Sequence, residues 1–143
     1  MIRRNSGFTL TELMVTIAVV SILASLAIPN FIAWLPNYRL RSGAEEIHST
    51  LQLARVRAIK QNATATVTFN TANETFQASV GGQTFRRGQM PAGIDINSTT
   101  FGGASVQFDS RGFASAAGSA VVSNNLGRVR TIAVYITGNS RIN

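Results

Sequence analysis

The feature that most constrains this sequence is an uncharged run near its N-terminus. No charged residue occurs from Leu13 to Tyr38, a run of 26 positions whose most apolar part is residues 13–28. A helix needs roughly 20 apolar residues, each adding about 1.5 Å, to cross the hydrocarbon core of a bilayer. Arg3 and Arg4 precede the run, so the positive-inside rule places the N-terminus in the cytoplasm. We therefore predict a single-pass helix, with the rest of the chain outside the cytoplasm.

Three interpretations of this run remain open. A secretory signal peptide would be cleaved near Ser25-Leu26-Ala27, which has a small-x-small pattern. Against it, Glu12 lies inside the segment that would form the apolar core of such a peptide, where a carboxylate is disfavoured. A plain signal anchor is the second interpretation. The third depends on the order of residues, in which a short basic leader is followed by Gly7-Phe8-Thr9-Leu10-Thr11-Glu12 and then by the apolar stretch.

This order resembles the processing site of type IV prepilins and type II secretion pseudopilins. The resemblance implies that residues 1–7 are a leader peptide, which a prepilin peptidase removes by cutting after Gly7 before it N-methylates Phe8. It also implies that residues 8–36 form a hydrophobic transmembrane and assembly helix in the bacterial inner membrane. Residues 37–143 would then be a periplasmic, pilin-like globular domain that later joins a filament.

Glu12 is expected to have a role beyond anchoring. A carboxylate at the centre of a bilayer costs about 2.5–3.5 kcal/mol, and less near the interface. Four residues from a free amine at Phe8, it can pair with that ammonium or with the one of a neighbouring subunit. In the resembled family this pairing helps to dock a new subunit into the growing filament, so Glu12 is a candidate assembly residue. The alternative is a carboxylate that reaches back to the lipid headgroups.

Beyond Asn37 the spacing of apolar residues predicts an amphipathic helix. Six residues recur at steps of three and four and share one stripe of such a helix. They are Leu40, Ala44, Ile47, Leu51, Ala54 and Ala58. Three apolar residues lie off the stripe, where contact with a loop and packing against neighbouring helices of a filament explain them equally well: Leu53, Val56 and Ile59. Pro29 and Pro36 are predicted to interrupt the helical pattern and favour a kink.

The second half of the chain predicts a small antiparallel sheet. Residues 63–69 alternate apolar and threonine side chains, as a half-buried strand does. Gly81-Gly82 predicts a hairpin turn and Met90-Pro91-Ala92-Gly93 a further turn. The strands expected are residues 63–69, 75–80, 83–86, 105–108, 120–123 and 131–136. One long helix packed on an antiparallel sheet is an α+β fold, and this order of elements is also the one that the pilin resemblance implies.

The composition argues against catalysis. The chain has no cysteine and a single histidine, His48, which excludes a Cys-ligated or two-histidine metal site and leaves little basis for a catalytic triad. We expect His48 to be a satisfied surface histidine. Glu45 and Glu46 point about 100° apart on a helix, so they form no carboxylate pair. No phosphate-binding loop, nucleophile elbow or dinucleotide motif is present. We predict no enzyme activity, no cofactor and no metal.

The lack of cysteine and two segments resemble the FimT/GspH type of minor pilins and pseudopilins. The segments are Met90-Pro91-Ala92-Gly93-Ile94 and Val106-Gln107-Phe108-Asp109-Ser110-Arg111-Gly112. The resemblance implies a structural subunit that initiates, caps or decorates a type IV pilus or a type II secretion pseudopilus. Its implied partners are the prepilin peptidase, other pilin or pseudopilin subunits and the inner-membrane assembly platform. Both filament systems use the same anchor, so both remain open.

A DNA-binding minor pilin that acts in DNA uptake is the alternative function. Some FimT-type pilins bind DNA through a Gly-Arg-x-Arg motif near the C-terminus, and Gly127-Arg128-Val129-Arg130 has this pattern. In that family the motif follows the last apolar strand, a place held here by Gly138-Asn139-Ser140-Arg141. Arg128, Arg130 and Arg141 are the candidate phosphate contacts, and solvated loop charges are the favoured explanation of them. A few such contacts would bind weakly and lose affinity steeply with salt.

Overall fold

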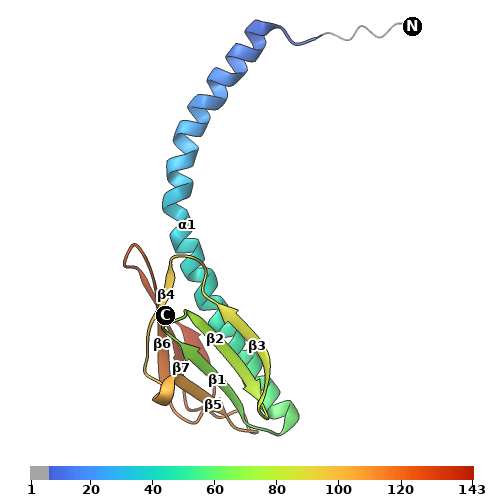
Figure 1. Cartoon of the computed structure of the whole chain (residues 1–143), viewed down its shortest axis with the longest axis vertical. Helices are drawn as coiled ribbons and strands as arrows, with labels where there is room; N and C mark the ends of the chain where they lie inside the picture. Colours follow the sequence, from blue (N-terminus) through green and yellow to red (C-terminus); the bar gives the residue numbers. More distant parts are fainter. Residues whose placement is uncertain (1–6) are drawn as a thin grey trace, which may run out of the picture. The chain divides into compact units, whose positions relative to one another are not determined.

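A computed structural model describes residues 7–143, so Arg3 and Arg4 lie outside the described residues. The elements shown in Figure 1 are helix α1 (Leu10–Gln61), strands β1 (Ala65–Asn70), β2 (Thr75–Val80), β3 (Gln83–Gln89) and β4 (Ile94–Thr99), the short 3-10 helix η1 (Gly102–Ala104), and strands β5 (Ser105–Phe108), β6 (Gly118–Asn124), β7 (Val129–Val134) and β8 (Ser140–Ile142). The chain divides into two compact units, residues 1–35 and 36–143.

In the first unit, α1 exposes nearly all of its side chains. From Leu10 to Trp34 every residue except Ala24 is exposed. Within residues 7–143, α1 is the one helix that is long and apolar enough to cross a membrane. In this first part of α1, the hydroxyls of Ser21 and Ser25 donate to carbonyl oxygens of the preceding turn, each at 2.7 Å. The serines are therefore satisfied inside the helix, as an apolar environment requires.

The two prolines do not end this helix. Pro29 and Pro36 both lie inside α1, which is continuous from Leu10 to Gln61. A proline removes its own N–H from the hydrogen-bond ladder, and the bonds of the neighbouring turns remain. The predicted interruption of the helix is therefore wrong for this structure.

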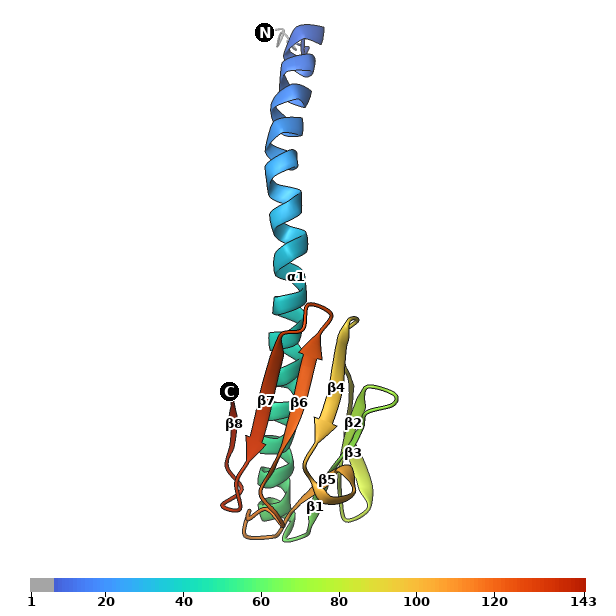
Figure 2. The same cartoon turned by 90° about the vertical axis from the view of Figure 1, so that its left-hand side faces the viewer.

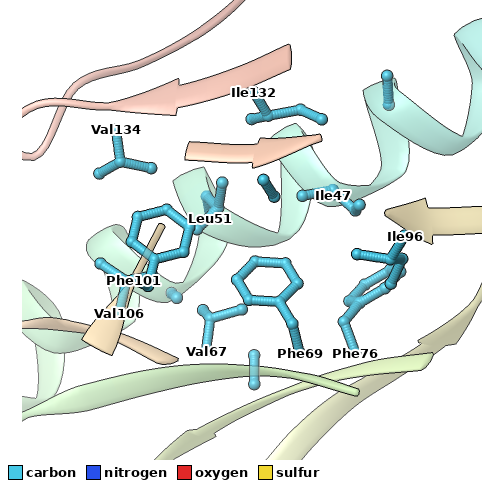
Figure 3. Close-up of a cluster of buried hydrophobic side chains, with 14 of the residues drawn as sticks. Ile47, Leu51, Val67, Phe69, Phe76, Ile96, Phe101, Val106, Ile132 and Val134 are labelled. Atoms are coloured by element: carbon cyan, nitrogen blue, oxygen red, sulfur yellow. The ribbon is translucent and has the colours of Figure 1, made fainter. Parts of the chain in front are cut away.

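In the second unit, α1 buries the predicted stripe. All six predicted residues are buried, together with two that the apolar pattern does not include, Gly43 and Thr50. The Thr50 hydroxyl donates to the carbonyl oxygen of Glu46 at 2.9 Å, so this buried polar group is satisfied within the helix. Figure 3 shows Ile47 and Leu51 facing apolar side chains of the strands. The helix and the strands therefore share one core.

The strands form two antiparallel sheets of four strands rather than the single small sheet that was predicted. Sheet A has the order β3-β2-β1-β5, and sheet B has the order β4-β6-β7-β8. Figure 2 shows β6 and β7 in front of the second half of α1, with β4 beside β6. Phe69 of β1 stacks on Phe101, which precedes η1, with ring centroids 5.7 Å apart. The α+β class is confirmed, and the core is lined by α1 and both sheets.

Strands β4 and β8 were not predicted from the sequence, and each omission has a physical reason. In β4, Ile94 and Ile96 are buried and alternate with exposed Asp95, but the pattern is too short to stand out beside the turn at residues 90–93. β8 has only three residues and pairs with β7. The hairpin between β2 and β3 is confirmed, because Gly81 and Gly82 both have positive φ, as a type I′ turn requires.

A close contact in sheet A gives a first test of this packing. Gly88 of β3 lies over the buried ring of Phe76, and a Cβ on Gly88 would lie 2.1 Å from the ring. Gly88→Ala should therefore lower the free energy of unfolding by about 1–3 kcal/mol, because the core is already filled. Urea unfolding of residues 36–143 measures this effect. The control is Gly102→Ala, where a Cβ meets nothing within 4 Å. Equal unfolding midpoints for the two variants would contradict the packing described here.

Candidate assembly site

Glu12 is held by a reciprocal hydrogen-bond pair at the start of α1. The Thr9 backbone N–H and hydroxyl donate to Glu12 Oε2 at 2.9 and 2.8 Å, and the Glu12 N–H donates to Thr9 Oγ1 at 3.2 Å. This is a capping box, in which two residues three positions apart satisfy N–H groups that the first helical turn leaves free. The capping box was not predicted, although Thr-x-x-Glu before an apolar run is its sequence signature.

The capping box places Glu12 beside the predicted processing site. Gly7 and Phe8 precede the helix, and the Phe8 side chain is 78% exposed. Cleavage after Gly7 would keep both members of the box, because Thr9 and Glu12 lie in the mature chain. The Glu12 carboxylate accepts a bond from the nitrogen of Thr9, one residue from the nitrogen that cleavage would free. Glu12 and the new terminus at Phe8 are only four positions apart in the sequence. Their predicted pairing is therefore compatible with the capping box.

The three candidate DNA-contacting arginines do not share one surface. Arg130 of β7 lies opposite buried Val122, and it lines a groove of about 210 Å³ beside Arg41 and Glu45 of α1. Arg141 of β8 lies opposite Ala133, so it belongs to the other face of sheet B. The structure thus separates Arg141 from Arg130.

Arg128 lies in a tightly bonded turn. The Oδ1 atom of buried Asn124 accepts from the N–H groups of Leu126 and Arg128 at 3.1 and 3.0 Å, while its Nδ2 donates to Asn37 Oδ1 at 3.3 Å. The backbone of this turn is therefore fixed to the beginning of the second unit, and the arginine side chain is exposed. DNA binding by Arg128, Arg130 and Arg141 stays a prediction.

Arg55 ties two loops to α1, and no sequence pattern indicated it. Its guanidinium donates to the Gly112 carbonyl at 3.0 Å, to the Thr137 carbonyl at 3.2 Å and to Asn139 Oδ1 at 2.8 Å. Gly138 lies between two of these partners with φ of +78°, and a Cβ there would lie 1.8 Å from the Gly112 oxygen. The loops after β5 and after β7 are thus held against each other and against the helix.

Asp109 organises the loop after β5. Its Oδ1 accepts from the N–H groups of Arg111 and Phe113, each at 2.9 Å, and its Oδ2 forms an ion pair with Arg111 at 3.1 Å. The Phe113 N–H contributes most to lowering the pKa of this carboxyl, and Arg111 adds to the effect. The segment from Val106 to Gly112, which carried part of the family resemblance, is therefore the end of a strand and the loop that Asp109 caps.

The remaining titratable side chains of residues 7–143 form no reactive cluster. His48 is half-buried, and its Nε2 lies 3.1 Å from the Ser140 carbonyl oxygen, so the histidine links α1 to β8. Glu45 pairs with Arg41 at 2.8 Å rather than with Glu46. In residues 7–143 no group of three histidine, aspartate or glutamate side chains could hold a metal ion. His48 therefore connects two elements of the fold, whereas the ion pair of Arg41 and Glu45 lies within α1.

Comparison with protein families decides what this architecture is. Residues 43–139, well over half of the chain, match the family described as type II transport protein GspH. The chain belongs to the GspH family. Residues 2–28 match the prokaryotic N-terminal methylation motif. The prediction of a GspH-type minor pilin or pseudopilin, made from residues 7–13 and the segments at 90–94 and 106–112, is confirmed.

Two solved structures share the GspH-family fold at low sequence identity. The type IV minor pilin FimU of Pseudomonas aeruginosa is 16% identical, with a TM-score of 0.64 over 75% of this chain and 90% of that chain. The minor pseudopilin EpsH from the type 2 secretion system of Vibrio cholerae is 10% identical, with a TM-score of 0.61 over 73% of this chain and 96% of that chain. These likenesses show the fold.

A curated relative matches only part of the chain. The type IV major pilin protein PilA of Myxococcus xanthus is 47% identical over 49 residues, which are 34% of this chain. The match spans about a fifth of the length of that pilin.

Acidification tests the loop that Asp109 organises in this GspH-family domain. Its pKa in the folded state is lowered from the ordinary value of 3.8, so the folded state favours the carboxylate. The resulting stabilisation is present above that value and is lost as the pH falls through the folded-state pKa. Between about pH 5 and pH 2, wild type should therefore lose more stability than Asp109→Asn. Melting temperatures of residues 36–143 measured across this range check the expectation, and parallel profiles would contradict it.

Proposed function

We propose that this chain is a structural subunit that initiates, caps or decorates a type IV pilus or a type II secretion pseudopilus. The observation that carries the proposal is the combination, in one chain, of a GspH domain at residues 43–139 and an N-terminal methylation motif at residues 2–28. A structural subunit needs no reactive centre, which agrees with the structural contacts that His48 makes to β8 and Glu45 makes within α1.

The first half of α1 supports an inner-membrane anchor that later packs inside a filament. Its exposed apolar side chains need an apolar environment, which either a bilayer or neighbouring pilin helices provide. In this proposal the N-terminus is cytoplasmic and residues 37–143 are periplasmic. The prepilin peptidase, other pilin or pseudopilin subunits and the inner-membrane assembly platform are its partners.

The mature N-terminus tests the processing step. A prepilin peptidase cutting after Gly7 gives a chain that begins with N-methylated Phe8, whereas a signal peptidase cutting after Ala27 gives one that begins with Ile28. We expect mass spectrometry of the protein isolated from membranes to find methylated Phe8. A chain that begins at Ile28, or one that keeps residues 1–7, would exclude this role.

Two substitutions at Glu12 separate its charge from its capping bonds. Glutamine serves in a capping box as glutamate does but carries no charge, whereas alanine removes both. If the charge pairs with the N-terminal amine of Phe8, Glu12→Gln and Glu12→Ala should both insert into the membrane and both fail to enter filaments. Fractionation of membranes and sheared filaments measures the two steps. Wild-type incorporation of Glu12→Gln would show that capping is the role of this residue.

A further inference from the structure

The end of the globular unit at which α1 finishes carries large exposed apolar side chains. Ile59, Phe113, Tyr135 and Ile136 are between 46% and 62% exposed. We call these four residues the terminal apolar set. Single exposed apolar residues are normal on a protein surface, but several on segments that contact one another are typical of an interaction site.

These four residues belong to three segments that are bonded to one another. The Ala114 N–H donates to the Ile136 carbonyl at 2.9 Å, which joins the loop after β5 to the end of β7. Ile59 Cδ1 lies against Gly112, where it would be 2.7 Å from an added Cβ. Arg55 binds both loops from the helix. The three segments are thus fixed before any partner arrives, which lowers the entropy cost of binding.

The charge around the terminal apolar set is positive. The Arg111 side chain is 78% exposed, and its guanidinium carbon lies 5.5 Å from the centroid of the Phe113 ring. Lys60 is exposed one position beyond Ile59. Asp109 forms an ion pair with Arg111 and offsets that charge, so the excess positive charge at this end comes from Lys60 and from Arg55, whose guanidinium is bonded to neutral oxygen atoms. A partner that covers this end therefore gains from carrying negative charge.

The same charge argues against a second copy of this chain. Residues 36–143 contain eleven arginines and lysines and five aspartates and glutamates. Two copies that met through this end would bring together two surfaces with the same excess positive charge, and like charges that face each other oppose association. The occupant that the charge favours is a different, acidic protein.

We propose that the terminal apolar set docks an acidic neighbouring subunit of the same filament. That subunit presents aliphatic or aromatic side chains to Phe113 and Ile136 and carboxylates to the excess positive charge at this end. The apolar contact supplies the affinity, and the charges select the partner over another copy of this chain. This proposal rests on the proposed function, because it requires that the chain enter a filament.

Site-specific photo-crosslinking in cells that express the full chain tests the contact. A photoreactive phenylalanine analogue replaces Phe113 or Ile136, and the control position is Gln77, which is exposed in β2 of sheet A. We expect adducts from positions 113 and 136, but not from position 77, with a protein that is acidic and carries an N-terminal methylation motif. Adducts mainly with lipid, with a second copy of this chain, or equally from position 77 would overturn the proposal.

A pair of double variants tests whether the contact is needed. Phe113→Ser with Ile136→Ser should lower the amount of this chain in sheared filaments at least fivefold, and its melting temperature should stay close to that of wild type because both side chains are exposed. The matched control is Leu126→Ser with Val129→Ser, two exposed apolar residues outside the set. Full incorporation of the first variant, or equal loss from both, would overturn docking here. Absence of the wild-type chain from filaments would instead overturn the proposed function.

Discussion

The burial of one stripe of α1 against two sheets is the interaction on which the rest of this domain depends. The two sheets draw their strands from distant parts of the chain, since β5 pairs with β1 in sheet A while β4 pairs with β6 in sheet B. Side chains from both sheets meet the helix in one core. Each large side chain such as Ile47 or Leu51 contributes about 1.5–3 kcal/mol on burial. The helix therefore supplies the shared surface that makes this arrangement of strands stable.

The same helix follows a different physical rule in its first half. Residues 10–34 carry apolar side chains all round, and the structure leaves them exposed, with the serine hydroxyls bonded inside the helix. Such a segment is unstable in water and stable in a bilayer or among similar helices. The two family matches agree with this division of the helix. The GspH match covers residues 43–139 of the globular part, and the methylation motif covers residues 2–28, which include most of the apolar part.

The parts of the fold that the sequence predicted are those set by local patterns. The buried stripe has a helical period, β2 and β5 have the expected bounds, and Gly81-Gly82 forms the expected turn. The division into two sheets and the links between distant segments had no such pattern. Arg55 binds residues that lie 57 to 84 positions away, and the Glu74 carboxylate accepts the N–H of Ile96, in another sheet. A single arginine in a helix or a single glutamate in a loop forms no sequence pattern from which such distant partners could be predicted.

The position of Arg55 also separates stability from assembly in this domain. Its three hydrogen bonds do not reinforce the apolar core but fix loops whose apolar side chains remain exposed. Flexible loops with the same residues would lose conformational entropy on binding and would expose backbone groups in the meantime. A fixed end avoids both costs, and substitutions of its exposed side chains leave the core intact. Evolution can therefore alter the surface that this end offers to a neighbour without disturbing the helix and the two sheets that hold it in place.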